Sequence, residues 1–308
     1  MPEIPILDEL GADLRVAFRA RERRRRRGLW AVPVAAAAAA GALVVANAVD
    51  SPPATAAELL RRAAHAAQTA PAPFPRDDQY FYVRSLTTNL MTSEPPKPGQ
   101  QALVTVERRI WTSVKRRGRL ESTFVSATYP GASAEQIRAM REHVGVTAGG
   151  PAHDIGHQRY RLGSIELSRE GMLAFPTDPR AIYTRLRAQV EDKGHSPDGE
   201  VFTEIGDALR ETAVPAGLRA GLYGALALIP GVELVGDTTD RAGRHGVAVA
   251  FTEVGMRNEL IFDPATSEML AERTVLVDPA AAQLPLPKGT VIGDSAYLER
   301  AVVDELPR

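Results

Sequence analysis

The sequence predicts an α+β protein, an antiparallel β-sheet meander with helices packed on one face, preceded by one transmembrane helix. Three observations predict it. Segments rich in aromatic and β-branched residues form two groups, with helical patterns between them. Turn residues join neighbouring strand segments, which favours antiparallel hairpins. An uncharged segment near the amino terminus has the length that a bilayer requires.

The uncharged segment spans residues 29–49, about 31 Å of helix at 1.5 Å per residue. Trp30 lies where an interfacial aromatic anchor is expected. A basic cluster precedes the segment and consists of Arg23, Arg24, Arg25, Arg26 and Arg27. Because a block of arginines is costly to translocate, we expect a cytoplasmic amino terminus and an extracytoplasmic carboxy-terminal domain. The lipid bilayer is then the first partner of this chain.

A cleavable export signal is the alternative interpretation of the same segment. Small residues at Ala46 and Ala48 suit a signal peptidase, and Arg26-Arg27-Gly28-Leu29 loosely resembles a twin-arginine signal. Both interpretations export residues 50–308. We favour a retained anchor, which makes the chain a single-pass protein of the cell membrane in the bacterial envelope.

The expected organisation is a basic cytoplasmic tail at 1–28, a transmembrane helix at 29–49, a juxtamembrane helix and linker at 50–77, and an extracytoplasmic α+β domain at 78–308. The tail carries a net charge of +3 and the rest of the chain −4. An acidic outer portion predicts no nucleic-acid partner. The absence of cysteine excludes thiolate metal sites, a cysteine nucleophile and disulfides. No cofactor is predicted.

Hydrophobic periodicity and turn signals place the elements of the outer portion in order. Expected helices occupy 56–69, 179–191, 199–211 and 215–229. Expected strands occupy 79–90, 103–114, 120–129, 232–239, 246–252, 258–262, 269–277 and 291–303. Residues 130–162 show no sustained period, which predicts a long surface loop with a short helix near 135–141.

Several motifs resemble a family of actinobacterial single-pass membrane proteins. They are the arginine run with its Ala-rich span, AAELLRRAA at 56–64, QYFYVRS at 79–85, FPTDPRAIYTRLR at 175–187, and the segments 202–251 and 260–277. The family has no established activity, so the resemblance implies a membrane protein without assigning catalytic residues. It also suggests a link to extracytoplasmic-function sigma factors. The sheet pattern is similar in architecture to the half-barrel of lipoprotein carriers.

Two motifs lack the partners that their chemistry requires. His153 and His157 have the i, i+4 spacing of a helical zinc pair, but Gly156 weakens a helix and no third ligand is evident. Gly293-Asp294-Ser295 resembles a lipase nucleophile block, yet no histidine follows Ser295 to act as its base. We therefore predict no metal site and no catalytic residue.

Aromatic residues gather on the predicted strands, among them Tyr80, Tyr82, Trp111 and Phe124. They could line an apolar groove for an acyl chain or a peptide, or they could form the ordinary core under the helices. We favour the core interpretation.

These observations favour a non-enzymatic extracytoplasmic sensing or interaction module with a cytoplasmic or envelope protein partner. The apolar residues Ile6, Leu10 and Leu14 follow helical spacing in the tail, which suits a docking helix or a helix on the membrane surface. A lipid or lipoprotein carrier that binds an acyl chain in a sheet groove is the alternative. An exported hydrolase is the third hypothesis.

Overall fold

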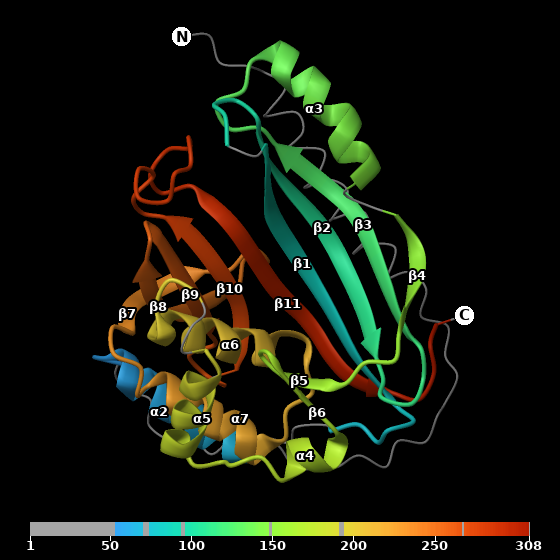
Figure 1. Ribbon diagram of the computed structural model, residues 1–308, viewed down its shortest axis with the longest axis vertical. Helices are drawn as coiled ribbons and strands as arrows, with labels where there is room; N and C mark the ends of the chain where they lie inside the picture. The colour runs from blue at the N-terminus through green and yellow to red at the C-terminus, as the bar shows by residue number, and fades with distance from the viewer. Residues whose placement is uncertain are drawn as a thin grey trace, which may run out of the picture. The chain divides into compact units, whose positions relative to one another are not determined.

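A computed structural model describes residues 53–69, 74–93, 96–147, 150–190, 194–266 and 268–307. They belong to one compact unit, Val49–Arg308, with an α+β fold built on a large antiparallel sheet (Figure 1). Among these residues no helix has the length and apolar character to cross a membrane. The expected span at 29–49, the arginine cluster and Trp30 lie outside the described residues.

Nine of the described strands form one sheet in the order β4-β3-β2-β1-β11-β10-β9-β8-β7. The sheet consists of two antiparallel meanders, β1 to β4 and β7 to β11. They form one sheet because the first strand, β1, pairs with the last strand, β11. The strands are β1 Tyr80–Thr92, β2 Gln101–Thr112, β3 Gly118–Thr128, β4 Gly150–Gly156, β7 Glu233–Thr239, β8 His245–Glu253, β9 Met256–Phe262, β10 Met269–Leu276 and β11 Val291–Val303.

Side-chain caps start two of the helices, α5 as predicted and α6 two residues earlier than predicted. Asp178 caps α5 by accepting from the Ala181 backbone N–H at 2.8 Å, and Ser196 caps α6 by accepting from Gly199 at 3.0 Å. A proline follows each cap in the first turn of the helix. Proline has no backbone N–H, and the first turn has no acceptor within the helix for one. The helices are α2 Ala56–Thr69, α3 Ala134–Thr147, α4 Arg169–Leu173, α5 Pro179–Gln189, α6 Pro197–Glu211 and α7 Ala216–Leu226.

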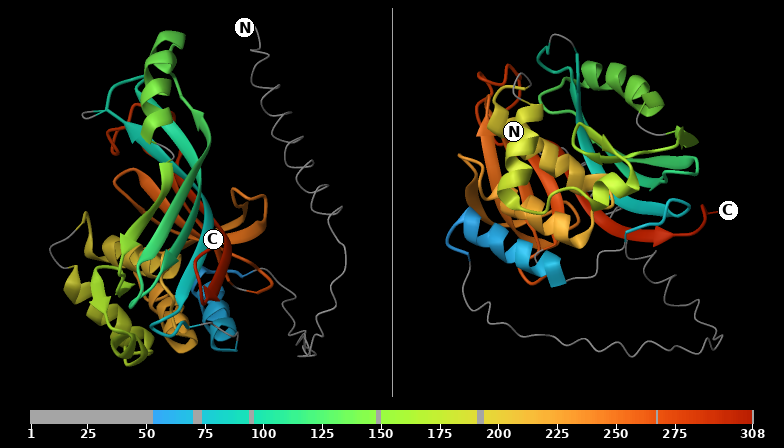
Figure 2. Two further views of the ribbon diagram at one scale, coloured as in Figure 1. Left: turned by 90° about the vertical axis from the view of Figure 1, so that its right-hand side faces the viewer. Right: turned by 60° about the horizontal axis from the view of Figure 1, so that its bottom comes forward.

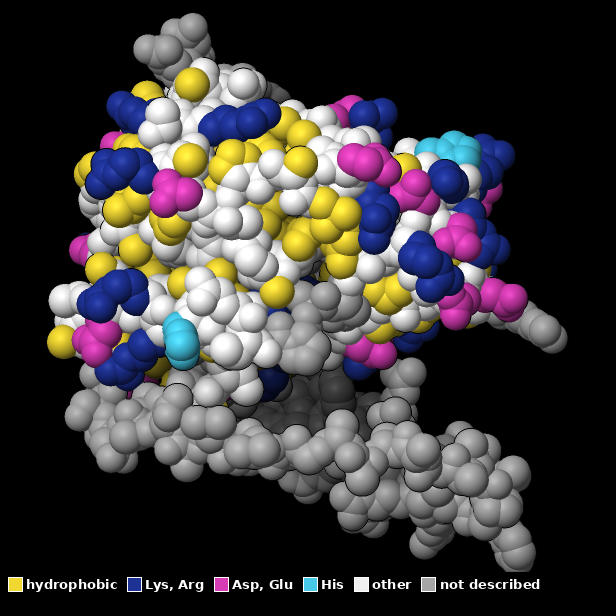
Figure 3. Space-filling view, turned by 90° about the horizontal axis from the view of Figure 1, so that it is seen from below, with side chains coloured by type: hydrophobic (Ala, Val, Ile, Leu, Met, Phe, Trp, Pro, Cys, Tyr) yellow, Lys and Arg dark blue, Asp and Glu magenta, His cyan; other side chains and the backbone are white. Residues whose placement is uncertain are grey.

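One face of the sheet, here the inner face, packs against these helices. Alternation along β1 points Phe81 and Val83 to the inner face, while Tyr80 and Tyr82 point to the opposite, outer face. The sheet curves around α6 (Figure 2). Seen from below, the helical side carries interspersed basic and acidic side chains with apolar patches between them (Figure 3).

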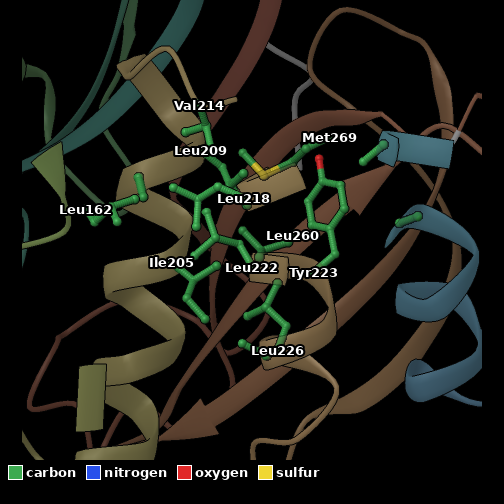
Figure 4. Close-up of a cluster of buried hydrophobic side chains, with 14 of the residues drawn as sticks. Leu162, Ile205, Leu209, Val214, Leu218, Leu222, Tyr223, Leu226, Leu260 and Met269 are labelled. Carbon is green, nitrogen blue, oxygen red and sulfur yellow. The ribbon is translucent and has the colours of Figure 1, made fainter. Parts of the chain in front are cut away.

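The main core lies between α2, α5, α6, α7 and the inner face of β8, β9 and β10 (Figure 4). Leu222 and Leu226 of α7 are fully buried, as is Phe262 of β9, whose ring meets Tyr223 edge-on at 5.4 Å between centroids. The helix predicted at 56–69 also contributes, because its apolar side chains pack with this cluster and the helix lies against α7. The segment expected as a juxtamembrane helix and linker thus supplies part of the core.

The prediction for residues 130–162 was wrong in part. The short helix is longer than predicted, and the expected loop contains β4, which pairs with β3 at the edge of the sheet. A small hairpin of β5 Tyr160–Leu162 and β6 Ile165–Leu167 follows. The sequence carries little signal for β4, because GPAHDIG has one β-branched residue and is held by backbone pairing to its neighbour.

Candidate functional site

A cavity of about 350 Å³ opens on the inner face, between α6 and strands β1, β9, β10 and β11. It exists because the inner-face residues change from apolar to polar along the strands. In β1 the apolar Phe81 and Val83 are followed on the same face by Ser85 and Thr87. Gly206 of α6 contributes no side chain to the wall, which leaves the space open.

Three hydroxyl groups form a ladder across the wall of this cavity. Ser295 of β11 donates to Thr87 Oγ1 at 3.3 Å, and Ser85 Oγ lies 3.3 Å from the same oxygen. The register pairs Ser295 with Thr87, so neighbouring strands place these side chains on one face. All three are at most 9% exposed. Each hydroxyl can both donate and accept, so the ladder can exchange hydrogen bonds with a polar ligand.

An ion pair joins α6 to the sheet beside the ladder. Arg210 Nε lies 2.7 Å from Glu272 Oε1, and Arg210 Nη2 lies 2.9 Å from Asp207 Oδ1. Burial raises the pKa of Glu272 above its ordinary value, although Arg210 draws it down. Burial opposes the charge on Arg210 as well, but attraction to Glu272 outweighs it and raises the pKa of Arg210. Register places Glu272 directly opposite Ser295.

Tyr297 closes the inner end of the cavity. Its side chain is almost fully buried, and its hydroxyl lies beside the Glu272 carboxylate without a well-aligned hydrogen bond. Burial raises the pKa of Tyr297, and the neighbouring Glu272 carboxylate adds to the effect. The guanidinium of Arg300 lies 4.3 Å from the ring centroid on the side of the core. The Glu272 carboxylate is the acceptor within reach of this buried hydroxyl, and a buried hydroxyl needs such a partner.

Further polar groups line the outer part of the cavity. Arg108 of β2 is hydrogen-bonded to Glu211 at the end of α6. Thr274 of β10 donates to Asn258 Oδ1 of β9 at 2.9 Å. The cavity is therefore lined mainly by polar and ionised side chains rather than by the leucines and valines of the adjacent core.

Asp294, next to Ser295 in β11, points to the opposite, outer face of the sheet and carries the clearest prediction of pH dependence. Burial raises its pKa from 3.8 to about 6, against the attraction of Arg241 and Arg273. The folded state holds this proton where the unfolded chain has lost it, so stability should fall as pH rises from about 4 to 6. We expect Asp294→Asn to flatten this part of the stability curve, as measured by urea midpoints at several pH values. An unchanged slope in the variant would refute this assignment.

The predicted aromatic groove residues do not line one groove. Tyr80, Tyr82 and Trp111 lie on the outer face, where Tyr82 stacks on Trp111 at 4.9 Å between centroids. Phe124 pairs with Val106 and lies on the inner face, 45% exposed. None of the four lines the cavity beside α6.

The structure also shows where the histidine pair and the Gly-Asp-Ser motif lie. His153 lies on strand β4, which does not have the helical geometry of an i, i+4 pair with His157. Among the described residues no group of three or more His, Asp or Glu side chains is arranged to hold a metal ion. Ser295 lies in the cavity wall within the hydroxyl ladder.

Sequence reasoning missed Glu272, Arg210 and Tyr297 as a group. The available signal was a glutamate inside a predicted strand, followed by Arg273 and Thr274 and flanked by the apolar ends of β10. Its partner Arg210 is 62 positions earlier in the numbering, on a different type of element, so only the fold brings the two together. Comparisons with protein families, curated proteins and solved structures found no match.

Proposed function

We propose that this chain is a single-pass envelope protein whose extracytoplasmic domain is a non-enzymatic binding and sensing module. Its ligand site is the polar cavity beside α6. The single observation that carries the proposal is a preformed cavity lined by hydroxyls and ion pairs, with the buried hydroxyl of Tyr297 beside the Glu272 carboxylate at its end. Ligand pockets are mostly preformed concavities with a few convergent polar groups. The bilayer anchor at 29–49 and a protein partner for the tail belong to the same proposal.

The chemistry of the cavity favours binding over catalysis. No imidazole from the described residues lines it, so Ser295 has no histidine base beside it. The Glu272 carboxylate is engaged by Arg210 and by the Tyr297 hydroxyl, so it already accepts from two donors of the protein. Ser295 donates its hydroxyl proton to Thr87, which is not a base that could remove the proton and activate Ser295 as a nucleophile.

The same lining argues against an acyl chain as the occupant. Burying apolar chain against ionised Arg210 and Glu272 would desolvate both groups without offering a hydrogen bond. The space that a carrier would keep open under its helices is occupied here by packed side chains from α6 and α7.

Carriage of an acyl chain remains a second candidate because of a different region. Beneath α3 lies another cavity of about 350 Å³, whose lining includes Met91, Ala102 and Met140. It adjoins an apolar cluster of the inner face, and Phe124 and Val125 on β3 are 45% and 38% exposed. If this region carries lipid, Ala139→Phe should reduce the acyl lipid that co-purifies with the chain.

Gly206→Ala provides a direct test of the proposed site. A Cβ at this position would lie 3.6 Å from Leu260 Cδ2 and 3.9 Å from Glu272 Oε2, which are ordinary contact distances. The fold should therefore accept the methyl group and gain up to about 1 kcal/mol, since alanine favours a helix over glycine. The cavity loses volume at its centre.

The measurement compares polar small molecules that co-purify with the full chain from its own membranes. We expect a compound enriched with the natural sequence and depleted with Gly206→Ala, while urea denaturation shows equal or higher stability. Gly217→Ala in α7 is the matched control, because its Cβ would meet Thr177 Cγ2 at 3.5 Å, away from the cavity. Equal recovery of the compound from both variants would exclude the cavity as its site.

A further inference from the structure

We propose that a second cavity, at the fork where β10 and β11 separate, binds a small organic carboxylate with an apolar body. This site is distinct from the cavity beside α6, and it does not depend on the function proposed for that cavity. Three features carry the inference: two arginines without a carboxylate partner, an excess of one positive charge in the lining, and apolar walls.

The fork leaves a cavity of about 230 Å³. The pairing of β10 with β11 ends at Ala271 and Ala296, while β11 continues beyond this point beside β1. Arg300 of β11 reaches across the fork and donates to the backbone oxygen of Met269 at 3.2 Å. Four of the lining residues lie together at the upper end of the core in Figure 4: Leu209, Val214, Tyr223 and Met269.

Two arginines line this cavity and form no ion pair with any described residue. Arg219 Nε is buried and has no hydrogen-bond partner among these residues. Arg300 donates to the backbone oxygens of Met269 and Leu209, which carry only partial charges, and burial lowers its pKa. Arg219 also lies in the first turn of α7, where Pro215 supplies no side-chain cap to offset the positive end of the helix dipole. Because buried charges are normally paired, an anion in the cavity would supply the missing partner.

The lining as a whole has one positive charge in excess. Its ionised side chains are Arg219, Arg244, Arg300, Glu268 and Glu299. Arg244 and Glu299 each have a partner outside the lining. Glu268 is exposed and acts on Arg300 from a distance, so it offsets only part of the charge of the two unpaired arginines. The excess matches a ligand with a single negative charge.

The walls between these charges are apolar. They are formed by Phe81, Leu209, Val214, Met269, Leu270 and Leu298. An inorganic oxyanion would lose its hydration against such walls, whereas a carboxylate with an apolar body suits both parts of the lining. Guanidinium groups also match the two oxygens of a carboxylate. The volume of about 230 Å³ is below the usual range of ligand pockets, so the ligand is small.

The test is a calorimetric titration of the full chain in an uncharged detergent at neutral pH. The probes are benzoate, its neutral analogue benzamide, and inorganic phosphate. We expect benzoate to bind and benzamide to bind at least about tenfold more weakly, because benzamide cannot compensate the unpaired guanidinium groups. Phosphate should also bind more weakly than benzoate, because it makes no use of the apolar walls.

Variants assign the binding to the fork. Arg219→Gln should weaken benzoate binding by about tenfold or more. The fold should tolerate this change, since the Arg219 side chain has no hydrogen-bond or ion-pair partner among the described residues. Glu268→Gln should strengthen binding about twofold to fivefold, because it removes the carboxylate that opposes the ligand. Arg180→Gln is the matched control and should have no effect, since Arg180 is an exposed arginine of α5 that does not line the cavity.

Several results would overturn the inference. They are failure of benzoate to bind, benzamide binding as tight as that of benzoate, and benzoate binding that survives Arg219→Gln. Phosphate binding tighter than that of benzoate would contradict the class of ligand. Weaker benzoate binding in Glu268→Gln would contradict the excess of positive charge on which the inference rests.

Discussion

Phe262→Ala should lower the free energy of unfolding by about 3–5 kcal/mol, the range for removing a fully buried aromatic side chain. Phe262 is fully buried on the inner face of β9. It pairs with Val247 and Met269 on the neighbouring strands and meets Tyr223 of α7 edge-on. Alanine would leave a cavity where the sheet and the helical layer join, and the surrounding α7 side chains cannot close it without moving.

Urea denaturation of the full chain, followed by circular dichroism, measures this effect. Phe124→Ala is the matched control, since it deletes the same ring at a site that is 45% exposed. We expect the control to cost less than about 1 kcal/mol. Similar losses in the two variants would contradict the packing of α7 on β9.

Glu259→Leu should also cost about 3–5 kcal/mol, for an electrostatic reason. The Glu259 side chain is completely buried on the outer face and accepts from Arg257 Nε at 2.8 Å and from Arg273 Nη2 at 2.6 Å. Leucine preserves most of the volume but leaves two guanidinium groups without their counter-ion. Arg273 also donates a hydrogen bond to Thr238 Oγ1 at 2.7 Å. The loss of stability should therefore extend to the edge strand β7.

A second substitution distinguishes the charge from the packing. Arg273→Met in the Glu259→Leu background removes one of the two stranded cations, and part of the lost stability should return. Glu107→Leu is the matched control, because Glu107 accepts from Arg109 at 2.7 Å but is 22% exposed, where an ion pair contributes about 1 kcal/mol or less. If the double variant were less stable than Glu259→Leu alone, the ionic explanation would fail.

Local sequence signals predicted most of the fold. The helix at 56–69 and the strand at 291–303 agree with the structure in both bounds, and Asp178 caps α5 as its position before proline predicts. These elements have strong local determinants, either capping residues or runs of β-branched side chains. Strand β4 has neither and depends on its neighbour β3, so residues 130–162 could not be assigned from local signals.

The candidate site was harder to predict because its residues come together only through the register in which distant strands pair. The serines and threonines of β1 and β11 are ordinary strand residues until the pairing of Thr87 with Ser295 places them on one face. The pair of Arg210 and Glu272 depends on where α6 crosses β10. Tyr82 and Trp111 were correctly predicted to lie on the sheet. Which face of the sheet they point to depends on strand pairing and not on composition, so their outward direction could not be predicted.

The central proposal is that the domain with the cavity beside α6 lies on the outer side of the membrane. The chain contains no cysteine, so a single Thr203→Cys at the rim of the cavity is a unique label site. We predict that an impermeant maleimide labels it in intact protoplasts, as it should label Ala242→Cys in an exposed turn, while Ala12→Cys reacts only after lysis. Labelling of Thr203→Cys that requires lysis, or labelling of Ala12→Cys from outside, would contradict the account.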